Sequence, residues 1–111
     1  MSSDSLGSLE LTVLIAVARL KDEAFGLAVR RDVSDRTGRE YSVGAIYTTL
    51  QRLEDKGFLA SRATDPLPVR GGRSRRQFVM TAAGQKALRH AQQVATSVWS
   101  GVRASLRPTI A

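Results

Sequence analysis

Apolar residues lie on almost every side of the segment from Ser8 to Leu20. A helix with this pattern is buried over most of its surface. We therefore expect a helix over residues 8–20, partly covered by a second chain, because a chain of 111 residues has few places to bury a whole helix. The run is too long and too rich in leucine and alanine to favour a strand.

Two shorter amphipathic helices follow. The first is predicted from Phe25 to about Arg36, where apolar residues recur at helical spacing before Gly38. The second is predicted from Ser42, a good N-cap, to Lys56, and ends at Gly57. Its inward stripe is expected to contain Val43, Ile46, Leu50 and Leu53. Its outer face is expected to contain Ala45, Thr48 and Arg52, with Thr49 and Gln51 on the flanks.

A β-hairpin is the expected next element. Residues 58–64 and 76–80 have the short β-branched or alternating pattern of strands. The segment between them contains two prolines and a glycine pair, which indicates a loop. Arginines at or beside its tip are Arg70, Arg73, Arg75 and Arg76.

A long final helix is predicted from Ala82 to Leu106, capped by Thr81 and ended by Pro108. Its apolar residues have the 3-4-3-4 spacing of a coiled coil, which needs a partner, and Trp99 lies beside this stripe. Together with the first helix, the stripe predicts a homodimer. The expected interface residues are Leu11, Leu14, Leu88, Ala91, Ala95, Val98 and Val102.

The predicted fold is therefore mainly α with a small β-hairpin: a winged helix-turn-helix followed by a long dimerisation helix. We expect a DNA-binding domain over residues 1–81, a dimerisation helix over 82–107 and a tail over 108–111. The outer face of the third helix has the size and polarity of an element that enters the major groove.

The charge distribution favours a polyanionic partner. All ten acidic residues lie between Asp4 and Asp65, whereas residues 66–111 contain eight Lys or Arg and no Asp or Glu. This asymmetry is typical of proteins that bind nucleic acid or an anionic membrane surface. The absence of nearby acid beside the loop arginines favours phosphate contacts.

Several other classes of function are disfavoured. The chain has no cysteine and one histidine, His90, so thiolate chemistry and a multi-histidine metal site within one chain are excluded. It contains no recognisable catalytic triad, carboxylate pair or P-loop, and we expect no enzyme activity, cofactor or metal. No apolar run is long enough to cross a bilayer and no signal peptide is evident, so the expected location is the cytoplasm, without membrane contact.

At the level of motifs, the sequence resembles the PadR-like transcriptional regulators. The resemblance covers about residues 6–90 and is most specific over Ser42 to Gly57, which reads SVGAIYTTLQRLEDKG. It is also carried by LELTVL from Leu9, AFGL from Ala24 and RRQFVMTAAG from Arg75. The length is similar to that of the short branch, which has one C-terminal helix. Phe25 stands where the family usually has tyrosine, and Gln77-Phe78 where a tyrosine pair is common.

The resemblance, together with the arginine-rich loop, favours DNA contact over a merely solvated helix face. The residues expected to touch DNA are Ser42, Tyr47, Thr48, Thr49, Arg52, Lys56, Arg70, Arg73, Arg75 and Arg76. Tyr47 borders the inward stripe and is expected to be half core. Trp99 falls near the position where a drug-binding member of the family places an interface tryptophan, so it is a candidate for binding a small aromatic effector; packing is the alternative.

The expected function is that of a homodimeric, sequence-specific repressor of the PadR-like type that binds double-stranded DNA at an inverted repeat and is relieved by a small aromatic ligand. One alternative is an effector-independent DNA-binding protein controlled by its abundance or by a protein partner. Another is a non-specific polyanion binder, which the sparse basic residues of the last helix disfavour.

Overall fold

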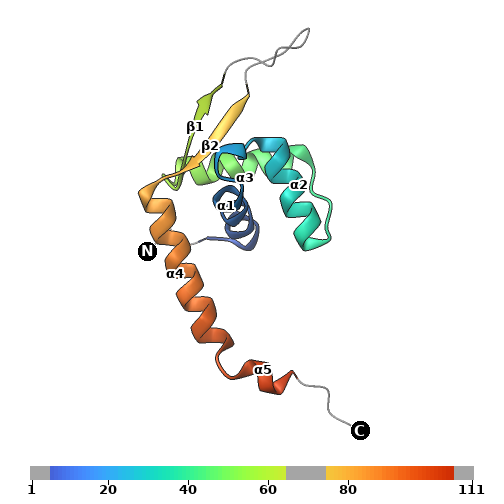
Figure 1. Ribbon diagram of the computed structural model, residues 1–111, viewed down its shortest axis with the longest axis vertical. Helices are drawn as coiled ribbons and strands as arrows, with labels where there is room; N and C mark the ends of the chain where they lie inside the picture. The colour runs from blue at the N-terminus through green and yellow to red at the C-terminus, as the bar shows by residue number, and fades with distance from the viewer. Residues whose placement is uncertain (1–5, 65–74, 107–111) are drawn as a thin grey trace.

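The computed structural model describes residues 6–64 and 75–106, and of residues 103 and 104 only the backbone. Three helices pack together, a hairpin projects from one side of them, and a further helix leaves on the opposite side (Figure 1). The predicted mainly α fold with one small hairpin is confirmed. The elements are α1 (Ser8–Leu20), the 3-10 turn η1 (Lys21–Glu23), α2 (Gly26–Thr37), α3 (Val43–Asp55), β1 (Leu59–Ala63), β2 (Arg76–Met80), α4 (Ala82–Trp99) and α5 (Val102–Ser105).

The predicted helix ends depend on local capping, and the structure has these caps. Gly38 has a φ of 72°, in the left-handed region that glycine adopts without strain, and it ends α2. The Ser42 hydroxyl accepts a hydrogen bond from the Ala45 N–H at 3.0 Å and so caps α3. The turn from Gly38 to Ser42 therefore fixes how α3 follows α2.

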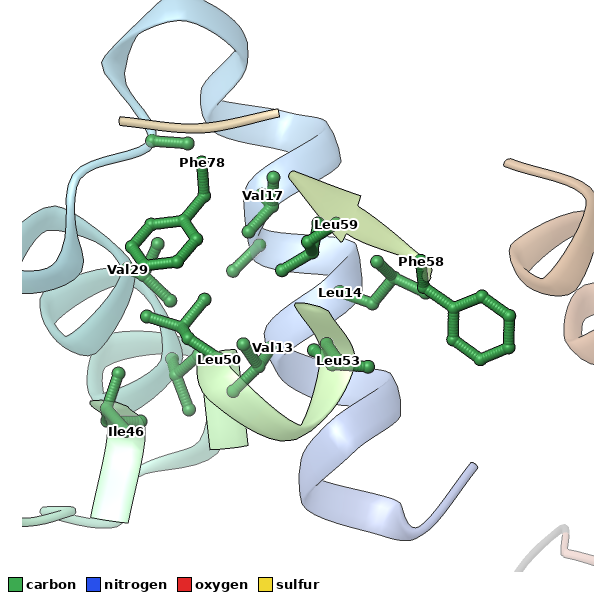
Figure 2. Close-up of a cluster of buried hydrophobic side chains, with 13 residues drawn as sticks. Val13, Leu14, Val17, Val29, Ile46, Leu50, Leu53, Phe58, Leu59 and Phe78 are labelled. Atoms are coloured by element: carbon green, nitrogen blue, oxygen red, sulfur yellow. The ribbon is translucent and has the colours of Figure 1, made fainter. Parts of the chain in front are cut away.

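The core lies between the three helices and the hairpin (Figure 2). Helix α1 is at its centre and packs against α2, α3, β2 and α4. Burial of these side chains is the main force that holds the helices together. The core residues are Val13, Leu14, Ala16, Val17, Ala24, Val29, Val33, Ile46, Leu50, Leu53, Phe58, Leu59 and Phe78.

One expectation about α1 is corrected by this packing. Leu14 is fully buried within its own chain, so it has no surface with which to meet a partner. The other elements of the same chain cover most of α1, and the expected second chain would cover only part of what they leave open. Leu11 is half-buried and Ile15 is exposed, so this strip of α1 still offers apolar surface to a partner.

The hairpin pairs β1 with β2 in antiparallel register, with Leu59 opposite Met80 and Ala63 opposite Arg76. The chain just before α2 adds a short third segment. The Phe78 N–H donates to the Ala24 carbonyl at 2.8 Å, and Phe25 forms a bridge with Gln77. The hairpin is thereby attached to the start of the helix-turn-helix.

Helix α4 is anchored to the core at its first turn. The Thr81 hydroxyl accepts from the Gly84 N–H at 3.0 Å and donates to the Gly57 carbonyl at 2.6 Å. At Gly84 the helix lies so close to the chain that an added Cβ would be 2.2 Å from the Phe58 carbonyl oxygen.

The expectation of one continuous helix to Leu106 is wrong. Helix α4 ends at Trp99, and Gly101 adopts a φ of 79°, which turns the chain before the short helix α5. Val102 therefore begins α5 and does not continue the stripe of α4. Within residues 6–64 and 75–106, no helix is both long enough and apolar enough to cross a membrane.

Candidate nucleic-acid interface

The outer face of α3 is polar and exposed. Gly44, Thr48, Gln51 and Asp55 recur at spacings of three and four residues on the side opposite the buried Ile46, Leu50 and Leu53, and Arg52 is exposed on one flank. Thr48 and Arg52 were predicted on this face. Gln51 was expected on a flank but lies in the central row, and Asp55 was not predicted as a site residue.

Two residues of α3 lie opposite to their predicted positions. Val43 was assigned to the inward stripe but is 44% exposed, because it occupies the first helical position, at the edge of the packed surface. Thr49 was predicted to contact DNA but is buried. Its hydroxyl donates to the Ala45 carbonyl at 2.8 Å, one turn earlier in the helix, so the polar group is satisfied inside the fold.

Tyr47 and Ser42 contribute to the shape of the site. The Tyr47 ring lies directly over Gly26, where a Cβ would be 2.2 Å from the tyrosine hydroxyl. A side chain at position 26 would therefore require the Tyr47 ring to move. Tyr47 remains 38% exposed, so its ring both packs and faces solvent. The exposed Ser42 uses its hydroxyl as the cap of α3.

Lys56, at the end of α3, is paired with Glu10 at the start of α1. The Lys56 ammonium lies 2.9 Å from the Glu10 carboxylate. Burial would raise the pKa of Glu10, but hydrogen bonds from the Gly7 N–H and from Lys56, with the charges of Lys56 and Arg52, lower it overall. Any phosphate contact of Lys56 must therefore share its ammonium with Glu10.

Arg76, at the start of β2, is paired with an acid that the sequence does not place near it. Its guanidinium donates to the Glu54 carboxylate and to the Ser61 hydroxyl, both at 2.7 Å. The Ser61 hydroxyl also donates to Glu54. The expectation that the hairpin arginines have no acidic neighbour is therefore wrong for Arg76. Its ion pair ties the hairpin to α3.

Arg75 and Arg62 are exposed at the hairpin. The Arg75 guanidinium stacks over the ring of Phe25, with 4.0 Å between its carbon and the ring centroid. The Arg62 side chain donates to the Gln77 amide oxygen at 2.8 Å, and the Gln77 amide nitrogen donates to the Asp22 carbonyl at 2.7 Å. The predicted contacts Arg70 and Arg73 lie outside the described residues.

A second ion-paired cluster fixes α2 against α1. Arg19 of α1 donates to the Asp32 carboxylate of α2, and Arg36 adds a second ion pair one turn away. The hydrogen bond from Arg19 is the largest cause that lowers the pKa of Asp32, opposed by burial and aided by Arg36. The helices α1 and α2, which both pack against α3, are thus held together by ion pairs as well as by apolar packing.

The predicted dimer residues lie along α4 and the strip of α1 beside it. Leu11, Leu88, Ala91 and Ala95 line an open apolar groove of about 550 Å³ between the two helices, together with Ile15, Met80, Gln85, Arg89 and Gln92. Val98 is 70% exposed and Trp99 is 62% exposed. Leu88, Ala91 and Ala95 are thus brought to one groove with Leu11, whereas Val98 lies further along α4 and Leu14 is buried in the core.

The sequence matches a known family of proteins. The sequence pattern described as "Transcriptional regulator PadR-like family" matches residues 13–90. No curated protein is similar enough in sequence to count as a relative.

Solved structures share the winged-helix fold. A PadR family transcriptional regulator from Eggerthella lenta DSM 2243 is 25% identical, with 91% of this chain and 89% of that chain covered and a TM-score of 0.66. A PadR-like transcriptional regulator from Bacillus cereus is 20% identical, with 91% and 93% covered and a TM-score of 0.72. RosR from H. salinarum is 21% identical, with 90% and 83% covered and a TM-score of 0.72.

Proposed function

Because this chain belongs to the PadR-like family of transcriptional regulators, which is a family of DNA-binding proteins and not of enzymes, we propose that it is a sequence-specific repressor that binds as a homodimer. In this proposal α3 enters the major groove and the hairpin contacts the neighbouring backbone. The observation that carries the proposal is the exposed polar row of α3, together with the exposed Arg62 and Arg75 on the hairpin, which the Arg76–Glu54 ion pair ties to α3.

The chemistry of the exposed side chains decides which of them would contact base edges and which would contact phosphates. Thr48 and Arg52 on α3 offer a hydroxyl and a guanidinium to base edges. Arg75, with Arg70 and Arg73 of the adjoining loop, would bind phosphate, as would Lys56 and Arg76 if DNA competes with Glu10 and Glu54 for them. Ser42 and Tyr47 lie at the N-terminal half of α3, where recognition helices meet DNA.

Dimerisation is supported by the exposed apolar residues of α4. Val94 is 47% exposed, and Val98 and Trp99 are exposed further along the same helix. An isolated helix with this surface is unstable in water, and a second copy would cover it. The proposed interface consists of Leu11, Leu88, Ala91, Ala95 and Val98, with Val102 of α5 at its end. Two such heads would present their α3 helices to half-sites about 34–36 Å apart.

The domain plan and the location are parts of the same proposal. Residues 1–81 would bind DNA, residues 82–107 would form the dimer and residues 108–111 would be a tail, in a protein of the cytoplasm. The repressor would act by occupying a promoter and excluding the transcription machinery.

We also propose that a small aromatic effector relieves the repression. The groove between α1 and α4 is apolar and has the volume of a small-molecule site. Trp99 is exposed one turn beyond Ala95, so in a dimer it would face either the partner or a ligand at the end of this groove. Trp99 is the only tryptophan, so saturable quenching of its fluorescence by planar aromatic compounds would support the effector. Quenching that matches an inner-filter control would assign Trp99 to packing.

The alternatives make different predictions in one experiment. The protein is mixed with a pool of random duplexes and with the DNA immediately upstream of its own gene. The proposed function predicts enrichment of an inverted repeat and a gel shift that resists non-specific competitor. A general polyanion binder would enrich no sequence. Sequence-specific binding that no aromatic compound alters would favour control by abundance or by a protein partner.

A further inference from the structure

The C-terminal half of the outer face of α3 contains a hydrogen-bonded pair, Gln51 and Asp55, of which Asp55 is the last residue of the helix. The Gln51 side-chain nitrogen donates to the Asp55 carboxylate at 3.0 Å, and both residues are exposed. A carboxylate only accepts hydrogen bonds, so the nitrogen of the amide must face Asp55. The pair therefore fixes which way round the amide of Gln51 is held.

We propose, on the premise of the proposed function, that Gln51 reads an adenine in the major groove and that Asp55 positions it. The amide nitrogen carries two hydrogens, and Asp55 takes one of them. The other N–H and the carbonyl oxygen match the N7 acceptor and the N6 donor that adenine presents in the major groove. Asp55 thus leaves free the two groups that a bidentate contact with adenine needs.

The neighbours of Gln51 favour a base edge over the phosphate backbone. Gly44 and Thr48 lie in the same row and are shorter, and space for a Cβ is open at Gly44. The helix can therefore approach the floor of a groove, with Gln51 as the long side chain of the row. Asp55 carries a negative charge that repels phosphates, so the pair is unsuited to the DNA backbone.

A purely structural pair is the competing explanation, since Gln and Asp four residues apart stabilise an isolated helix. The two explanations differ in what they predict about DNA. A structural pair changes thermal stability and leaves base preference intact. A reading pair changes the preference at one position of the site and leaves the salt dependence of binding as it was.

The test uses duplexes that the full-length protein has itself enriched from a random pool. Each adenine is replaced in turn by 7-deazaadenine, which lacks the N7 acceptor. The expected result is one adenine in each half-site whose replacement weakens wild-type binding about tenfold. Gln51→Ala should already bind more weakly and lose nothing further at that adenine. Gln93→Ala, an exposed glutamine of α4, serves as the matched control and should behave as wild type.

The role of Asp55 is tested with two variants. Asp55→Asn keeps an oxygen acceptor and should keep the sensitivity to 7-deazaadenine, whereas Asp55→Ala should reduce it. If Asp55→Ala only raises affinity for all sequences, Asp55 is a repulsive charge and its positioning role is overturned. If Gln51→Ala remains as sensitive as wild type at every adenine, the reading role is overturned. A pool without any enriched sequence overturns the proposed function, and this inference with it.

Discussion

The Arg75 guanidinium stacks on the Phe25 ring at 4.0 Å, which joins the loop end of the hairpin, just before β2, to the residue that precedes α2. A cation held over an aromatic face keeps its N–H groups free at the rim. Arg75 is therefore held in place while it can still donate to a phosphate. Phe25 would orient the phosphate contact without touching DNA itself.

We expect Phe25→Leu to weaken binding to every DNA sequence by about twofold to fivefold, because an exposed cation–π contact contributes about 0.5–1 kcal/mol. Phe25→Tyr retains the ring and should bind as wild type. In an Arg75→Ala background, Phe25→Leu should have no further effect on the dissociation constant. An equal effect in both backgrounds would mean that Phe25 acts through stability alone.

Replacing Arg52 by alanine and replacing Arg75 by alanine should change DNA binding in different ways. Arg52→Ala is expected to weaken operator binding by about 1–3 kcal/mol and to relax the preference at one base position. Arg75→Ala should weaken binding to all sequences and lower the salt slope by about one for each phosphate that is no longer neutralised. Competition titrations at several salt concentrations separate the two. An unchanged operator preference in Arg52→Ala would contradict base reading by this residue.

Val98→Asp should abolish the proposed dimer, because it places an unpaired charge in an apolar seam at a cost of several kcal/mol. Sedimentation should show a monomer with weak DNA binding. Gln93→Asp adds the same charge on the opposite side of α4 and should remain dimeric. A dimer that survives Val98→Asp would place the interface elsewhere.

Acid should destabilise the fold through Glu10 and Asp32. Both carboxyls have a lowered pKa in the folded chain, so the unfolded chain binds protons more readily. Their contribution is complete above the unfolded pKa and is lost as pH falls through the folded one, from about pH 5 downward. Asp32→Asn should flatten the dependence of the free energy of unfolding on pH in this range, as measured by urea denaturation. Asp35→Asn, which removes an exposed carboxylate of the same helix, serves as the comparison. Its free energy of unfolding should depend on pH more steeply than that of Asp32→Asn.

Gly84→Ala should destabilise the chain by about 1–3 kcal/mol, because the new methyl group would overlap the Phe58 carbonyl oxygen and the Met80 side chain. Gly44→Ala places the same methyl group in open space within a helix and should stabilise the chain by up to about 1 kcal/mol. Thermal unfolding of the two variants gives the comparison. Equal melting temperatures would contradict the close contact at Gly84.

The helices, their caps and the hairpin were predictable because each depends on nearby residues. Ser42, Gly38 and the apolar period of α3 are local signals, and the structure agrees with them. The pairing of Arg76 with Glu54 joins residues 22 apart in sequence, so the absence of local acid was misleading. Thr49 was misplaced because its polarity suggested exposure, although its own helix supplies a partner for the hydroxyl. The turn at Gly101 was missed because the apolar spacing continues across it.

The close contact of α4 with Phe58 at Gly84 has a consequence for the spacing of the two half-sites in an operator. Gly84 lies against the Phe58 carbonyl, and Thr81 donates hydrogen bonds to the Phe58 and Gly57 carbonyls, so the first turn of α4 is fixed against the head. In the proposed dimer, the distance between the two α3 helices then depends on the angle at which the two α4 helices cross. Substitutions along α4 could retune half-site spacing while the base-reading residues stay unchanged.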